Sequence, residues 1–297
     1  MFPILSGNVA SATAVSGNQE GIFAYGYDTG YLSLSNLVSN AGVVADDVAG
    51  VGTARECWNG ATEYGGDKGI FGFGSGLTAV TNLVSNVGVV ADDTAGVGTA
   101  RYGAAACGYG EDTGLFGFGD TGSYTAITNL VSNVGVVASD VAGVGTARRY
   151  VAACEYGEDK AIFGFGYASG FVGMTNLVSN AGVVASDVSA VGTVRAGPAA
   201  CGYGGDKGIF AYGAVSGAQT AVSNLVSNVG VVASDVAGVG TVRSYLTGTQ
   251  YGGDKGIIAY GNPNTSLSNL VSNVGVVADD VAGVGTARGG LGACSFN

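Results

Sequence analysis

The amino-acid sequence repeats one pattern six times, and this repetition constrains the fold more than any other feature. An arginine recurs every 45 to 48 residues, and so does the motif Asn-Leu-Val-Ser-Asn, which begins at Asn36, Asn82, Asn129, Asn176, Asn224 and Asn269. A repeat of this length is one supersecondary unit, which must stack on its neighbours to bury its apolar face. The 297 residues are therefore expected to form a single repeat domain rather than two unrelated ones.

Within each unit the sequence predicts four short antiparallel strands joined by tight turns. In the third unit, residues 101–147, a strand of small residues ends at Tyr109 and a second strand follows from Leu115 to Gly119. A third strand is expected over residues 126–133, and a fourth begins at Val136. Glycine and polar residues between these segments are typical of tight turns, so each unit is expected to be a meander.

The second strand of each unit alternates aromatic residues with glycine. A period of two is typical of a β-strand, and it predicts that Phe116 and Phe118 share one face while Gly117 lies on the other. A sheet with bulky side chains on one face and none on the other can place its aromatic rings against the bare face of the next copy. We therefore expect successive units to pack aromatic residue on glycine.

Four-stranded units of this length are typical of β-propeller blades. The sequence resembles kelch-type propellers over residues 21–296: Arg101 precedes the first strand, Phe118-Gly119 ends the second, and Asp140 lies in a turn near the fourth. It lacks the double glycine and the fourth-strand tryptophan of kelch repeats. The near-identical copies also resemble repeat proteins of tailed-bacteriophage virion fibres and appendages. These resemblances imply an all-β, six-bladed β-propeller of four-stranded antiparallel blades.

The two ends of the chain predict how the ring closes. The segment from Arg288 to Phe296 has the arginine, cysteine and aromatic residue of a first strand, whereas Ser6 to Ser16 has neither the arginine nor the tyrosine. We expect the C-terminal strand to complete the first blade and close the ring. Residues 1–15 are then an N-terminal arm, without the features of a secretory signal, and residues 16–297 form the propeller domain.

Composition argues against several classes of function. A net charge of −11 disfavours nucleic acid as a partner. The sequence has no run of about 18 apolar residues, which argues against insertion into a membrane. It contains no histidine and therefore lacks the commonest general base and metal ligand. The expectation is a protein without catalytic residues, metal or cofactor, whose five cysteines are free and buried.

The recurrent arginines have an aspartate eight residues before them. One interpretation is a ring of cationic sites for an anionic ligand. Six identical copies suit a scaffold better than one binding pocket, so structural ion pairs are the prediction. The expected pairs are Asp47 with Arg55, Asp93 with Arg101, Asp140 with Arg148, Asp187 with Arg195, Asp235 with Arg243, and Asp280 with Arg288.

The units differ from one another mainly in two places, the loop after the aromatic strand and the residues just after each arginine. In a meander these two segments lie on the same side, which we call the variable face. Function usually depends on variable loops held by a rigid scaffold, although drift in unconstrained loops is an alternative. The predicted ligand- or partner-binding residues on this face are Tyr27, Tyr31, Trp58, Tyr102, Tyr124, Tyr150, Tyr167 and Tyr245.

These observations favour a non-enzymatic structural or binding protein. The prediction is a propeller located in a phage virion appendage, contacting a host-surface glycan or another virion protein. A secreted or cell-surface carbohydrate-binding propeller is the first alternative. A polysaccharide-acting enzyme is the second, because glycoside hydrolysis needs a pair of carboxylates. The glutamates considered for such a pair are Glu56, Glu63, Glu111, Glu155 and Glu158, none of which lies in a recognisable motif.

Overall fold

The structure, a computed structural model, describes residues 19–296, so the predicted arm at residues 1–15 lies outside the described residues. The described chain forms six three-stranded antiparallel sheets. Their strands, in sheet order, are β18-β1-β2 (Gly292–Phe296, Glu20–Tyr27, Tyr31–Val38), β3-β4-β5 (Ala61–Tyr64, Lys68–Gly74, Thr78–Val84), β6-β7-β8 (Ala105–Tyr109, Thr113–Asp120, Tyr124–Val131), β9-β10-β11 (Ala152–Tyr156, Lys160–Tyr167, Phe171–Val178), β12-β13-β14 (Ala199–Tyr203, Lys207–Val215, Ala218–Val226) and β15-β16-β17 (Thr247–Tyr251, Lys255–Ala259, Ser268–Val271).

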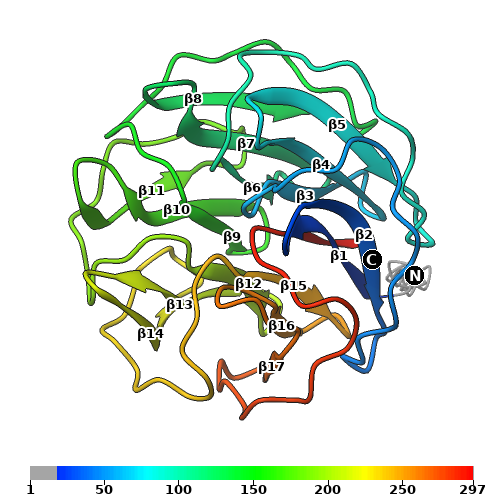
Figure 1. The fold of residues 1–297 in the computed structure, drawn as a ribbon. Coiled ribbons are helices and arrows are strands. Elements are labelled where there is room, and N and C mark those ends of the chain that lie inside the picture. Colours follow the sequence, from blue (N-terminus) through cyan, green and yellow to red (C-terminus); the bar gives the residue numbers. More distant parts are fainter. Residues whose placement is uncertain (1–18, 297) are drawn as a thin grey trace, which may run out of the picture.

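The six sheets follow one another around a common centre, with the first strand of each sheet innermost (Figure 1). The inner strands contact one another in the order β3, β6, β9, β12, β15 and β18, and β18 in turn contacts β3. These contacts form a closed circuit. Within residues 19–296 no helix is long and apolar enough to cross a membrane.

The C-terminal strand completes the first sheet, as the sequence predicted. β18 pairs antiparallel with β1, so that Phe296 lies opposite Glu20 and Gly292 lies opposite Ala24. Phe296 and Cys294 are buried against residues of the first and second sheets. The two ends of the described chain are therefore joined by a β-ladder and by a shared core.

The prediction of a fourth strand in each sheet is wrong. In the third unit the segment after β8 is attached only by isolated bridges, from Val137 to Val131 and from Val141 to Thr128. Between these bridges Asp140 turns its carboxylate toward Asn129, whose side-chain nitrogen lies 2.9 Å from Asp140 Oδ1. The segment is thus held beside β8 by isolated bridges and a side-chain hydrogen bond, without forming a continuous fourth strand.

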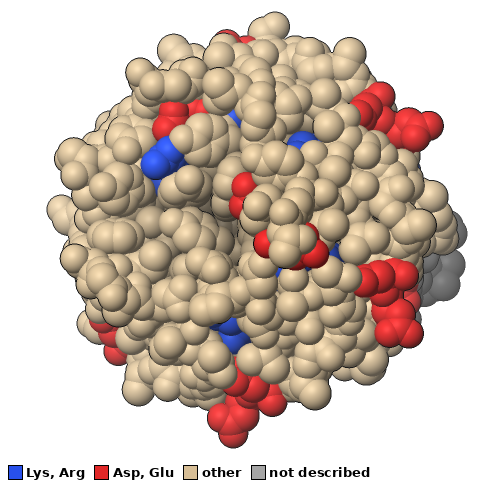
Figure 2. Space-filling model, viewed as in Figure 1, with Lys and Arg blue, Asp and Glu red and all other residues tan. Residues whose placement is uncertain are grey.

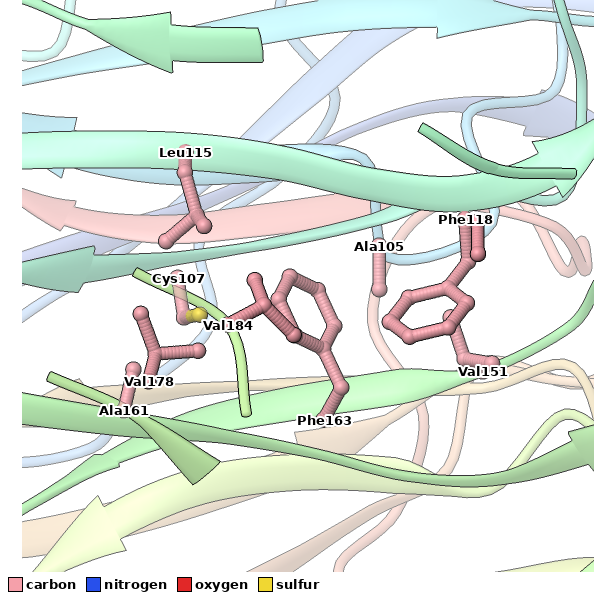
Figure 3. Packing of buried hydrophobic residues seen from close by; sticks show 10 residues of the cluster. Ala105, Cys107, Leu115, Phe118, Val151, Ala161, Phe163, Val178 and Val184 are labelled. Carbon is pink, nitrogen blue, oxygen red and sulfur yellow. The ribbon is translucent and has the colours of Figure 1, made fainter. Parts of the chain in front are cut away.

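The prediction that both aromatic residues of the second strand share a face is also wrong. The register of β7 shifts next to Phe118, whose φ is +62°, and this bulge turns the Phe118 ring to the opposite side from Phe116. Phe116 packs on Phe73 of the preceding sheet and Phe118 on Phe163 of the following sheet, each with 5.1 Å between ring centroids. Figure 3 shows Phe118 and Phe163 side by side between two sheets. Five of the six contacts between neighbouring sheets pair two rings in this way, and in the sixth Tyr212 packs with Ile258.

The expected packing of aromatic residue on glycine is confirmed. A Cβ atom added to Gly117 would lie 2.8 Å from the Phe163 ring, and one added to Gly72 would lie 2.7 Å from Phe116. Glycine is therefore needed where the ring of the next sheet lies against the strand. Burial of each ring stabilises the fold by a few kcal/mol, at about 25 cal/mol/Å² over about 150–250 Å².

Candidate binding site on the variable face

The six recurrent arginines lie inside the protein and cannot form a cationic surface, since their exposed fraction is 0–1%. Arg148 shows the arrangement. Its Nε donates to the carbonyl of Phe165 at 2.9 Å and its Nη2 to Oδ1 of Asn176 at 2.6 Å. The guanidinium also lies 4.1 Å from the Phe118 ring centroid of the preceding sheet. Burial lowers the pKa of Arg148 to about 10, which leaves it charged at neutral pH.

The aspartate paired with each arginine is not the one predicted. The expected partner lies eight residues before the arginine, whereas the contacts run to the aspartate that follows the outer strand of the sheet whose inner strand the arginine precedes. Arg148 Nη1 lies 3.8 Å from Asp187, not beside Asp140, and Arg288 Nη1 lies 3.8 Å from Asp47. In the same way, the charge of Arg55 acts on Asp93, that of Arg101 on Asp140, that of Arg195 on Asp235, and that of Arg243 on Asp280. Each pair therefore belongs to one sheet, where it joins the segment before the inner strand to the segment after the outer strand.

The two variable segments of each unit lie side by side, as predicted. Isolated bridges join the residue after the arginine to the end of the second strand: Tyr102 to Asp120, Arg149 to Tyr167, and Ser244 to Asn262. The variable face is therefore a continuous structural region. Figure 2 shows that most of the surface in view carries no charged side chain and that acidic side chains gather in small groups, several at the edge.

A collar of backbone hydrogen bonds holds the centre of this face. The amide of Tyr150 donates to the carbonyl of Gly103, that of Gly197 to Tyr150, and that of Tyr245 to Gly197, each at 2.8 Å. Tyrosine and glycine alternate along this collar. A Cβ atom on Gly197 would lie 2.6 Å from the Tyr245 ring, so the missing side chain makes room for the ring of the next unit.

Four of the predicted aromatic residues meet on the collar. Trp58 lies 5.4 Å from Tyr102 and 5.7 Å from Tyr150, and Tyr150 lies 5.1 Å from Tyr245, measured between ring centroids. All four rings are partly exposed. They come from four different units, so only the closed arrangement of sheets assembles them.

Beside this cluster lies a cavity of about 540 Å³, which we call the aromatic cavity. It combines aromatic rings with carboxylates and amides. Its lining residues are Tyr27, Asp28, Glu56, Trp58, Tyr150, Tyr245, Asn262, Pro263, Asn264, Gly289 and Gly290.

Two carboxylates in the aromatic cavity are held in different environments. Burial raises the pKa of Glu56 to about 7. Hydrogen bonds from the backbone amides of Thr29 and Gly30 lower the pKa of Asp28 below its ordinary value. Asn264 Nδ2 donates to the Asp28 carbonyl at 3.0 Å and so joins loops from the two ends of the chain.

The remaining predicted aromatic residues lie outside the cavity lining. Tyr124 faces Arg149, whose guanidinium carbon lies 5.5 Å from the Tyr124 ring centroid. Tyr167 lies 6.3 Å from Tyr124, and Tyr31 packs on Tyr27 at 5.4 Å. Tyr27 thus connects Tyr31 to the cavity, while Tyr124 is linked to the collar through Arg149, which lies between the rings of Tyr124 and Tyr150.

Two glutamates lie near the centre of the ring, in the inner strands. Glu63 of β3 and Glu155 of β9 share a hydrogen bond, and Ser295 Oγ donates to Glu63 at 2.7 Å. They line a central cavity of about 60 Å³, which has room for only a few water molecules. Asn59 crosses the centre nearer the variable face, donating to the carbonyls of Val151 and Pro198. Residues 19–296 contain no cluster of three or more acidic or thiol side chains placed to hold a metal ion.

The sequence indicated the aromatic residues but not their polar companions in the cavity. Asp28, Asn262 and Asn264 occur once each in loops of differing length, so no repeat marks them. Glu56 follows a recurrent arginine at the position occupied by Tyr102 in the next unit, and that variation was its only signal. No protein-family model matches this chain, and no curated protein matches its sequence.

Proposed function

We propose that this chain is a non-enzymatic, six-bladed β-propeller that binds a glycan in the aromatic cavity. The propeller assignment is supported by the closed circuit of inner strands and by the pairing of β18 with β1. The glycan assignment is carried by one observation: aromatic rings that differ from unit to unit line a cavity together with carboxylates and side-chain amides.

A sugar ring has apolar C–H faces and a rim of hydroxyl groups. Partly exposed aromatic rings such as Trp58 and Tyr150 match the first, because they offer rigid apolar area at low entropic cost. Carboxylates and amides match the second, because they accept and donate hydrogen bonds at fixed positions. The collar holds the rings in place before a ligand arrives, which favours affinity.

A glycan array followed by calorimetry tests this proposal. The triple variant Trp58→Ala, Tyr150→Ala, Tyr245→Ala is expected to lose at least 100-fold in affinity for any glycan that the native protein binds. The control is Tyr167→Ala with Phe171→Ala, because these two residues pack on each other and both lie outside the cavity lining. Melting temperatures identify variants that fail to fold. Equal binding by the triple variant and the control would refute the assignment.

An enzymatic role is the less favoured alternative. Glu63 and Glu155 share a direct hydrogen bond, whereas glycosidase carboxylates are about 5–9.5 Å apart with the sugar between them. Their central cavity of about 60 Å³ leaves no space for a sugar ring. A reducing-sugar assay on each bound glycan is expected to show no product, and a rising signal that Glu155→Gln abolishes would favour the enzyme.

We further propose that the protein belongs to a virion appendage and that its glycan lies on the host surface, or that it contacts another virion protein. This is supported by the resemblance of its near-identical units to virion repeat proteins. Mass spectrometry of purified virions and of the culture medium distinguishes this location from the secreted or cell-surface alternative.

A further inference from the structure

We infer that the aromatic cavity selects uncharged saccharides and rejects those carrying a carboxylate, sulfate or phosphate group. This inference rests on the proposed glycan-binding function and deepens it by naming the ligand class.

The charge of the cavity lining is the first argument. The lining contains two carboxylates, those of Asp28 and Glu56, and it contains no lysine or arginine to balance them. An anionic sugar ring placed against Trp58 or Tyr150 therefore meets one or two negative charges and no cation. Like charges a few ångströms apart in a partly desolvated site weaken binding by more than tenfold.

One partly exposed cation lies beside the aromatic cluster, and it is already engaged. Arg149 lies beside Tyr150, with its guanidinium carbon 4.7 Å from that ring centroid, but its Nη1 forms an ion pair with Asp120 at 2.9 Å. The guanidinium also faces the rings of Tyr102 and Tyr124. A ligand anion would have to displace Asp120 to use this charge.

The recurrent arginines offer no alternative. They are 0–1% exposed, and each donates to at least one carbonyl oxygen inside the protein; all except Arg101 also donate to a side-chain oxygen. The anion-binding chemistry that six arginines suggest in the sequence is therefore absent from the accessible surface of residues 19–296.

Glu56 gives the site a further means of discrimination. Its carboxyl group lies against Gly290, where an added Cβ would be 2.8 Å from Glu56 Oε1. Partial burial already disfavours its ionised form. A second negative charge nearby increases that penalty, whereas a neutral hydroxyl can donate to the carboxylate or accept from the carboxylic acid.

Matched pairs of oligosaccharides test the inference at pH 7.5 and low salt. Each neutral glycan that binds on the array is compared by calorimetry with the same glycan carrying one sialic or uronic acid. The neutral member is expected to bind at least 10-fold more tightly. The double variant Asp28→Asn, Glu56→Gln is expected to reduce this ratio to about 3-fold or less. The control Asp46→Asn, Asp92→Asn removes two exposed acidic groups outside the cavity lining and is expected to keep the full ratio.

The outcomes are distinguishable. Equal or tighter binding of the acidic member would overturn the inference but leave the glycan-binding function standing. An unchanged ratio in Asp28→Asn, Glu56→Gln would also overturn it, since selection would then come from other groups. Absence of binding to every neutral and acidic glycan would refute the proposed function and the inference with it.

Discussion

Asp47 accepts a hydrogen bond from Thr286, with 2.6 Å between Asp47 Oδ2 and Thr286 Oγ1, and so joins the first unit to the last. The Thr286 backbone amide donates to the same carboxylate, and Asn36 Nδ2 donates to its Oδ1 at 2.9 Å. Five equivalent contacts link the other neighbouring units, from Thr53 to Asp93, Thr99 to Asp140, Thr146 to Asp187, Thr193 to Asp235, and Thr241 to Asp280. The ring is thus closed outside the β-ladder as well as within it.

Replacing Asp47 by alanine is expected to destabilise the protein by about 1–3 kcal/mol, because Asn36 and Thr286 then lose a shared acceptor. The measurement is urea unfolding followed by tyrosine and tryptophan fluorescence. Asp46→Ala removes the neighbouring exposed carboxylate and is expected to change the free energy of unfolding by less than about 0.5 kcal/mol. Similar losses for both variants would show that the carboxylate of Asp47 has no special role.

The same six aspartates predict a loss of stability in acid. Burial alone would raise the pKa of Asp47, but hydrogen bonds from Thr286 and Asn36 and the charge of Arg288 lower it overall. A pKa that is lower in the folded state adds stability above the pKa of the unfolded state, and this stability is lost as the pH falls below about 4. Melting temperature is expected to fall from pH 5 to pH 2.5, with a smaller fall for Asp47→Ala. Parallel pH profiles for native and variant proteins would contradict this.

Gly117→Ala is expected to destabilise the protein by about 1–3 kcal/mol, because its new Cβ would lie 2.8 Å from the Phe163 ring. Gly170→Ala is the matched control, since no atom lies within 4 Å of a Cβ added there. Differential scanning calorimetry compares the two variants. The packing explanation fails if Gly170→Ala lowers the melting temperature as much as Gly117→Ala does.

Glu155→Gln is expected to stabilise the protein at neutral and alkaline pH. Burial and the neighbouring Glu63 raise the pKa of Glu155 well above its ordinary value. The associated stability is present below the pKa of the unfolded state and is lost as the pH rises toward the pKa of the folded state. The variant should melt about 2–4 °C higher than the native protein at pH 8 and at nearly the same temperature at pH 4. A constant difference across this range would argue against titration of Glu155.

Moving residues 288–296 to a position just before Gln19 is expected to preserve the fold. Phe296 already lies opposite Glu20, as Tyr64 lies opposite Lys68 in the second sheet, so a short turn can join them. Simple deletion of residues 289–297 should instead expose the edge of β1 and cause aggregation. Size-exclusion chromatography and circular dichroism distinguish the two proteins. Monomeric, native-like behaviour of the deletion variant would mean that β18 is dispensable.

The sequence predicted the features that depend on the repeat itself. The period, the packing of Phe163 on Gly117 and the return of the C-terminal strand all follow from comparing aligned copies. The sequence did not reveal that Phe116 and Phe118 lie on opposite faces of the strand. A left-handed φ at an aromatic residue such as Phe118 is uncommon, and the alternation of aromatic residues with glycine gives no sign of this φ. All six copies keep this left-handed φ, at Tyr25, Phe73, Phe118, Phe165, Tyr212 and Tyr260.

Other features depend on three-dimensional closure and have no local signal. Each of the first five recurrent arginines has an aspartate on either side in sequence, and the nearer one is the wrong partner; the partner of Arg288 is Asp47, near the other end of the chain. The aromatic cavity brings Asp28 next to Asn264, which are separated by 236 residues. Residues that occur once and meet only in the folded ring cannot be recognised from a period.

The link from Thr286 to Asp47 also has a thermodynamic consequence. In an open array of repeats the terminal units have one neighbour, fray first, and give unfolding that spreads inward from the ends. Here every sheet has two neighbours, and the unfolding of any one sheet exposes the packed faces of the two sheets beside it. Local opening therefore has no preferred starting point, and unfolding is expected to be a single cooperative transition with amide-exchange protection of similar depth in all six inner strands.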